Sequence, residues 1–101
     1  MPPSAHQLQR HIRTCALDTA CVFLTKHAQE RMQERGATLA MVYEVLQSGV
    51  LTGIPEPSIA STGVACKMQR CVCGENWVAC VAVEYPEPDL VVVTVYELEG
   101  A

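Results

Sequence analysis

Three side chains that can bind an anion or transfer a proton are spaced four residues apart in the first half of the chain. They are His27, Arg31 and Arg35. Residues four apart lie on one face of an α-helix, so an imidazole and two guanidinium groups would form a single polar ridge. Guanidinium groups bind phosphate or carboxylate through paired hydrogen bonds, and a neutral imidazole is a general base. The spacing therefore predicts a site that binds an anion and moves a proton.

The same spacing also fits a solvated surface helix. Glu30 and Glu34 lie within one turn of the two arginines, and such pairs on an exposed face stabilise a helix. In that alternative His27 has a structural role in the first turn and no catalytic one. The residue pattern leaves both interpretations open.

The helix that carries this ridge has clear end signals. Thr25 is a suitable N-cap, and Gly36 suits the position just past the C-terminus. Ala28 and Met32 lie on a neighbouring stripe and supply a narrow apolar side. The ridge is therefore expected to face solvent while the opposite side packs against the rest of the domain.

Two further helices are predicted around the central one. Residues 4–17 have apolar side chains at helical spacing, and Ser4 with Gln7 forms a capping box at the start. Thr38 can cap a helix that ends near Gly49. This helix and the central one are joined by a tight turn, which makes a helical hairpin.

After residue 49 the pattern changes to strands separated by turn residues. Residues 21–24 form a short extended segment before the central helix. The later strands are expected at 50–54, 64–72, 77–85 and 90–98, with turns at 55–57, 73–76 and 86–89. Helices followed by strands predict an α+β fold, with the helices packed on one face of a three- to four-stranded antiparallel meander.

Residues 1–21 are expected to be a helical extension, and residues 22–98 the main α+β unit of a single domain. Two of the expected strands are apolar at both parities, at residues 78–83 and 90–95. In a sheet with one solvent-exposed face, apolar and polar residues should alternate along each strand instead. Either the first helix or a second copy of the chain is therefore expected to cover the second face, and we favour a homodimer.

Composition limits the class of protein. The chain has 101 residues, 50% of them hydrophobic and 18% charged, which indicates one globular domain. Its net charge of −4 argues against strong non-specific binding to nucleic acid or an anionic membrane. No secretory signal or membrane-spanning run is seen, so a cytoplasmic protein without a membrane partner is expected.

Six cysteines in such a protein are expected to be reduced thiols. Cys66, Cys71, Cys73 and Cys80 are close in sequence and suggest a metal- or thiol-dependent regulator as an alternative. Their spacing differs from the paired cysteines of structural zinc sites, so buried thiols are favoured. We predict neither a metal nor a cofactor. His6 and His11 are assigned no function.

One string of residues resembles a known family. The string His-Ala-x-x-Arg-Met-x-x-Arg-Gly at 27–36, with residues 23–26 before it and 93–96 near the end, resembles a small bacterial family numbered 4258 among domains of unknown function. The likeness runs from about residue 22 to 97. These domains are distantly similar to the RelE/ParE and BrnT group of toxins, small α+β folds that include translation-blocking ribonucleases.

The resemblance implies a metal-independent ribonuclease. His27 would act as acid or base, Arg31 and Arg35 would stabilise charge on the phosphate, and Tyr96 would position the scissile group or stack on a base. Substrate contacts are expected from three further residues: Lys26, Arg70 and Thr94. The expected partners are an RNA substrate and an antitoxin-like protein. The alternative is a non-catalytic interaction module that keeps the fold and binds itself or an antitoxin-like protein.

Overall fold

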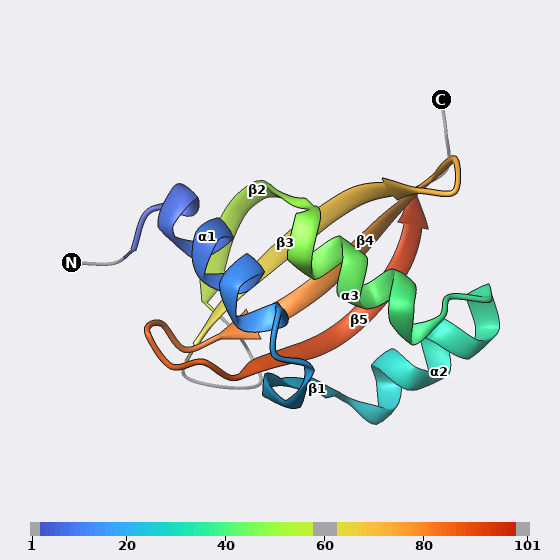
Figure 1. The fold of residues 1–101 in the computed structure, drawn as a ribbon, viewed down its shortest axis with the longest axis horizontal. Helices are drawn as coiled ribbons and strands as arrows, with labels where there is room; N and C mark the ends of the chain where they lie inside the picture. Colours follow the sequence, from blue (N-terminus) through green and yellow to red (C-terminus); the bar gives the residue numbers. More distant parts are fainter. Residues whose placement is uncertain (1–2, 58–62, 99–101) are drawn as a thin grey trace.

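Three helices precede most of the sheet along the chain (Figure 1). The computed structural model describes residues 3–57 and 63–98. The helices are α1 (Ala5–Ala16), α2 (Lys26–Arg35) and α3 (Leu39–Ser48). Each begins after a hydroxyl residue whose side chain accepts a hydrogen bond from the third N–H of the helix, at Ser4, Thr25 and Thr38. All three predicted helix starts are confirmed.

The sheet has five strands in the order β1-β5-β4-β3-β2. They are β1 (Val22–Leu24), β2 (Val50–Pro57), β3 (Val64–Val72), β4 (Glu75–Val83) and β5 (Leu90–Leu98), and a 3-10 turn η1 (Thr19–Cys21) precedes β1. The predicted α+β class and the antiparallel meander are confirmed, the meander being β2 to β5. The sheet as a whole is mixed, because the short β1 pairs parallel to β5. β1 has only three residues, and so short a segment shows no periodic pattern from which its place in a sheet could be predicted.

Three predicted strand boundaries are wrong, and one of them is the end of β4, which lies at Val83 instead of residue 85. β2 continues to Pro57 instead of stopping at Pro55, which an edge strand allows because its outer N–H groups need no partner. The turn between β3 and β4 is only two residues long, since Cys73 and Gly74 both have positive φ, 53° and 83°. This is the backbone of a tight hairpin turn, so β4 already begins at Glu75.

A β-bulge interrupts β5 near its middle. Cys80 of β4 is opposite Thr94, whereas the next residue, Val81, is opposite Val92. Val93 is therefore the extra residue of the bulge. The alternation of side chains along β5 is shifted by one residue at this point, so that Val92 and Val95 both belong to the buried core.

All three helices contribute to one core on one face of the sheet. Leu8 and Ile12 of α1 join Val45 and Leu46 of α3 in this core. The strands contribute alternate residues: Cys66, Met68 and Val72 from β3, Trp77, Ala79, Val81 and Val83 from β4, and Leu90, Val92 and Val95 from β5. The first helix therefore lies on the same face as α3 and does not cover the opposite face.

Hydrogen bonds also join α1 to the rest of the domain. The Leu51 backbone N–H donates to the Gln9 side-chain oxygen at 2.9 Å, and the Gln47 side-chain amide donates to the Ala16 carbonyl at 2.9 Å. Since these bonds add to the shared core, α1 belongs to the packed body of the domain. We call the opposite face of the sheet, over which no described helix packs, the open face.

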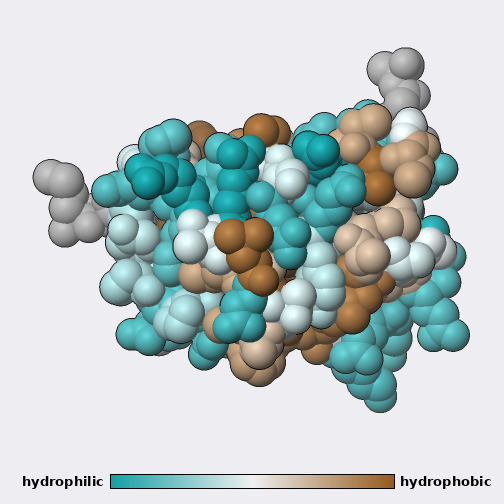
Figure 2. Space-filling view, in the orientation of Figure 1, coloured by the Kyte–Doolittle hydropathy of each residue, from teal (hydrophilic) through white to brown (hydrophobic). Residues whose placement is uncertain are grey.

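The surface seen from the helix side is largely hydrophilic, with scattered apolar patches (Figure 2). Around α2 the surface is almost entirely hydrophilic (Figure 2), in agreement with a solvated polar ridge. Within the described ranges no helix combines the length and the apolar character that a membrane crossing requires.

Thr25 joins α2 to the bulge of β5. Its hydroxyl accepts a hydrogen bond from the Ala28 N–H at 3.0 Å and donates one to the Val93 carbonyl at 3.1 Å. Its backbone N–H donates to the Val92 carbonyl, also at 3.1 Å. One partly buried side chain thus caps the helix and satisfies a carbonyl at the irregular point of the strand.

We predict that Thr25→Val lowers the free energy of unfolding by about 1–3 kcal/mol, because it removes an N-cap and leaves a carbonyl without its donor. Thr25→Ser keeps the hydroxyl and should lose less than about 1 kcal/mol. Urea unfolding followed by the fluorescence of the single tryptophan, Trp77, measures both values. Equal stability of the two variants would show that the hydroxyl does not hold this junction.

Candidate functional site

The predicted ridge on α2 exists and is anchored from behind. Ala28 is fully buried and Met32 nearly so, and both belong to the core. On the outer side His27 and Arg35 are exposed, and Arg31 is half-buried. The helix thus presents an imidazole and two guanidinium groups on a backbone that packing holds in place.

Arg31 is already paired within its own helix. Its guanidinium donates to the Glu34 carboxylate at 2.9 Å, and both side chains remain substantially exposed. Such exposed pairs contribute at most about 1 kcal/mol and exchange readily for another anion. The His27 ring and the Arg35 guanidinium make no hydrogen bond or ion pair with the described part of the chain.

The two predicted hydroxyl residues of β5 lie on the open face. Thr94 is opposite Cys80 and Tyr96 is opposite Val78. Residues that face each other across two antiparallel strands point to the same side, and Val78 and Cys80 alternate with the core residues of β4. The structure therefore places Thr94 and Tyr96 on the other side of the sheet from the core that α2 packs against.

The two remaining predicted contacts are separated from each other. Lys26 is exposed at the first position of α2. Arg70, on β3, donates to the Glu44 carboxylate and to the Ser48 carbonyl of α3, both at 3.3 Å. Arg70 thus has partners on the helix side, whereas Thr94 faces the open side.

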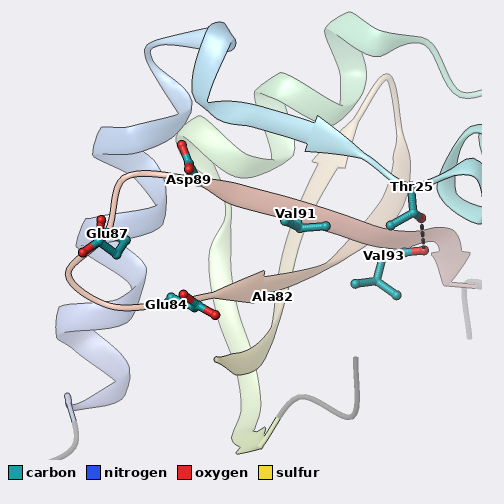
Figure 3. Close-up of a pocket in the computed structure, with 7 residues that line it drawn as sticks. All are labelled: Thr25, Ala82, Glu84, Glu87, Asp89, Val91 and Val93. Atoms are coloured by element: carbon teal, nitrogen blue, oxygen red, sulfur yellow. Dashed lines mark hydrogen bonds between the residues drawn. The ribbon is translucent and has the colours of Figure 1, made fainter. Parts of the chain in front are cut away.

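A cavity of about 680 Å³ opens on the open face, and the sequence pattern does not reveal it. Its lining combines aliphatic strand residues with acidic residues of the β4–β5 connection: Thr25, Ala82, Glu84, Glu87, Asp89, Val91 and Val93. Figure 3 shows Thr25 and Val93 at one end, joined by their hydrogen bond, and the acidic residues around the connection at the other. We call this cavity the acidic cleft.

The sequence contains one signal for the cleft. Residues 86–89, which the sequence predicts to form a turn, carry two carboxylates between two apolar strands. The connection is also held in place from outside: the His11 ring nitrogen Nε2 donates to the Glu87 carbonyl at 2.7 Å, and the His11 ring meets Tyr85 edge-on at 5.0 Å. His11, to which no function was assigned, therefore positions the acidic end of the cleft.

The four clustered cysteines lie on both faces of the sheet. Cys66 is buried in the core, whereas Cys71 is exposed and lies on the opposite face, five residues further along β3. Cys73 is exposed in the turn, and Cys80 is half-buried on the open face opposite Lys67. Among residues 3–57 and 63–98, no three His, Cys, Asp or Glu side chains form a group that could hold a metal.

Differences in burial give these thiols different pKa values. Desolvation raises the pKa of the Cys66 thiol from 9.0 to about 11. Desolvation also raises the pKa of Cys80, and the neighbouring Lys67 opposes that rise. A thiol is nucleophilic as the thiolate, so Cys66 is the least reactive of these groups.

The chain matches one family model. It is described as a domain of unknown function, DUF4258, and matches residues 24–97. No curated protein and no solved structure matches the chain. The matched residues include the α2 ridge and the acidic cleft but not α1, and the likeness to RelE-type toxins stays a prediction.

We predict that iodoacetamide at about pH 8 alkylates Cys71 and Cys73 well before Cys66, which should react only when urea unfolds the domain. Mass spectrometry of the digested protein measures each site. The folded state holds the Cys66 proton more tightly than the unfolded state, so the free energy of unfolding should fall as pH rises from 9.0 towards about 11.

The Cys66→Ala variant provides the control for this pH dependence. It has no thiol at this position and should show a smaller fall over the same range. Alkylation of Cys66 as fast as Cys71 in the native protein would contradict the prediction.

Proposed function

Since the chain belongs to the DUF4258 family, we propose its function from its own geometry: it is an interaction module that binds another protein through the open face. The observation that supports this proposal is that helices cover only one face of a sheet that is apolar on both. β4 and β5 are apolar at both parities, yet all three described helices pack on one side. Apolar strand residues with no covering layer are typical of a binding surface.

The exposure of individual side chains supports this proposal. Phe23 of β1 is opposite Val91 and is 50% exposed, and Val50 and Leu98 at other places on this face are 50% and 38% exposed. The acidic cleft lies beside Phe23, since Val91 is part of its lining. A partner would therefore meet an aromatic ring next to a concave pocket, a combination that often carries most of the binding energy.

The charge of the face favours a different protein over a second copy. Among the described strand residues the only cations are Lys67 and Arg70, and Arg70 has its partners on the helix side. The chain carries a net charge of −4, so two open faces with acidic clefts would repel each other. This distribution of charge therefore suits a basic partner better than the homodimer expected from the apolar strands.

We predict that a photoreactive benzoylphenylalanine in place of Phe23 crosslinks to a second protein in the cells from which the chain comes. The same residue in place of Leu39, 41% exposed at the start of α3, should give no such adduct and is the matched control. The captured protein is then purified, and its affinity for the unmodified chain is measured by calorimetry.

Phe23→Asp should weaken that affinity by at least about tenfold, because it buries a charge against apolar groups, and the solvated Leu39→Asp should not. Equal crosslinking from both positions would contradict the proposal. So would adducts formed only with a second copy, which would make the open face a self-association surface.

A second candidate function rests on α2. His27 is exposed beside two guanidinium groups, and only a weak surface pair engages one of them. This arrangement supports a metal-independent ribonuclease in which His27 transfers the proton and Arg31 with Arg35 binds the phosphate. Lys26, at the start of the same helix, would add to the attraction for RNA.

For this candidate we predict that induction of the chain in a bacterial host arrests growth and degrades total RNA. His27→Ala should lower the cleavage rate by about 10²–10⁴-fold, which is the usual contribution of a general acid or base. Gln33→Ala, exposed on the same helix, is the control and should keep full activity. Intact RNA with the folded wild type would contradict the ribonuclease function.

A further inference from the structure

The acidic cleft combines two kinds of surface along its length (Figure 3). Its floor is aliphatic and comes from Ala82 on β4 and Val91 and Val93 on β5. At one end, Glu87 and Asp89 bring carboxylates from the β4–β5 connection. A ligand that is apolar along its body and positively charged at one end would match both surfaces.

We propose that the cleft binds an arginine or lysine side chain from an extended segment of the partner protein, an inference that rests on the proposed interaction function. The methylene stem of such a side chain lies on Val91 and Val93. Its charged group reaches the carboxylates of Glu87 and Asp89. A guanidinium group fits best, since it donates paired hydrogen bonds to carboxylates.

Neither carboxylate forms an ion pair with the described part of the chain. The described ion pairs join Arg31 to Glu34 and Arg70 to Glu44, and neither includes Glu87 or Asp89. Glu87 is held through its backbone carbonyl, which accepts from His11, so its position does not depend on its carboxylate. The volume of about 680 Å³ lies in the range of ligand pockets and has room for neighbouring side chains of the partner segment.

The bulge in β5 lies at the apolar end of the cleft. Val93 is the extra residue at the bulge, and Thr25 holds its carbonyl. Both residues line the cleft. The end that receives the apolar part of the ligand is therefore built on a hydrogen-bonded junction, so little ordering is needed when a partner binds.

The probe for this proposal is an acetylated and amidated peptide of sequence Arg-Val-Arg-Val-Arg, titrated into the intact chain and followed by amide NMR shifts. Shifts should concentrate at Val91, Val93 and the 84–89 connection. The same peptide with citrulline in place of arginine keeps the shape without the charge. It should bind at least about tenfold more weakly, as loss of a charged hydrogen bond predicts.

The double variant Glu87→Gln/Asp89→Asn should weaken binding of the arginine peptide by at least about tenfold as well. The matched control is Glu30→Gln/Glu75→Gln, which changes the net charge equally on α2 and at the far end of β4. This control should alter the affinity by less than about twofold, because exposed distant charges are screened.

Three outcomes would overturn the proposal: no binding of the arginine peptide, equal binding of the citrulline peptide, or equal weakening by both double variants. The test is separable from that of the proposed function. A partner that crosslinks at position 23 while the peptide fails to bind leaves the open face as a docking surface without a cation pocket. If the peptide binds in the cleft while position 23 crosslinks to no protein, the cation pocket is supported and the proposed protein partner is rejected.

Discussion

The hydroxyl of Thr25 joins three elements of this domain at one point. That group lies where β1 ends, where α2 begins and where β5 departs from regular pairing. It accepts from the Ala28 N–H and donates to the Val93 carbonyl, so it uses its donor and one acceptor site at once. One side-chain oxygen therefore joins the start of α2 to the bulge of β5.

The second constraint is that one face of the sheet receives all the covering helices. α1 could in principle have covered the open face, since its apolar side could pack against either face of the sheet. It packs instead against α3 and the start of β2, where Gln9 and Gln47 add hydrogen bonds to the shared core. The apolar residues on the other side of β4 and β5 are therefore left to contacts among themselves, or to contacts with a partner.

The chain thus presents two surfaces of different chemistry on either side of Thr25. On α2, His27, Arg31 and Arg35 form a polar ridge whose two guanidinium groups suit an anion. In the acidic cleft, Glu87 and Asp89 suit a cation. Thr25 caps the helix that carries the one and lines the other.

Local patterns of residues were enough to predict the helices and strands and the signals that start them. The hydroxyl caps at Ser4, Thr25 and Thr38 act within one turn of helix, so they can be predicted without knowledge of the fold. The α+β class and the order of the meander followed from helical spacing giving way to strands and turns. The ridge on α2 was predictable because residues four apart share a face in any helix.

The side of the sheet on which each residue lies, and the residues that it meets there, depend on the packing of the whole domain. The bulge at Val93 shifts the alternation of β5, and the three-residue β1 becomes a strand only because β5 lies beside it. The cleft brings Thr25 next to residues more than fifty positions later in the chain. Such contacts depend on long-range pairing and packing, for which a local pattern of residues holds no information.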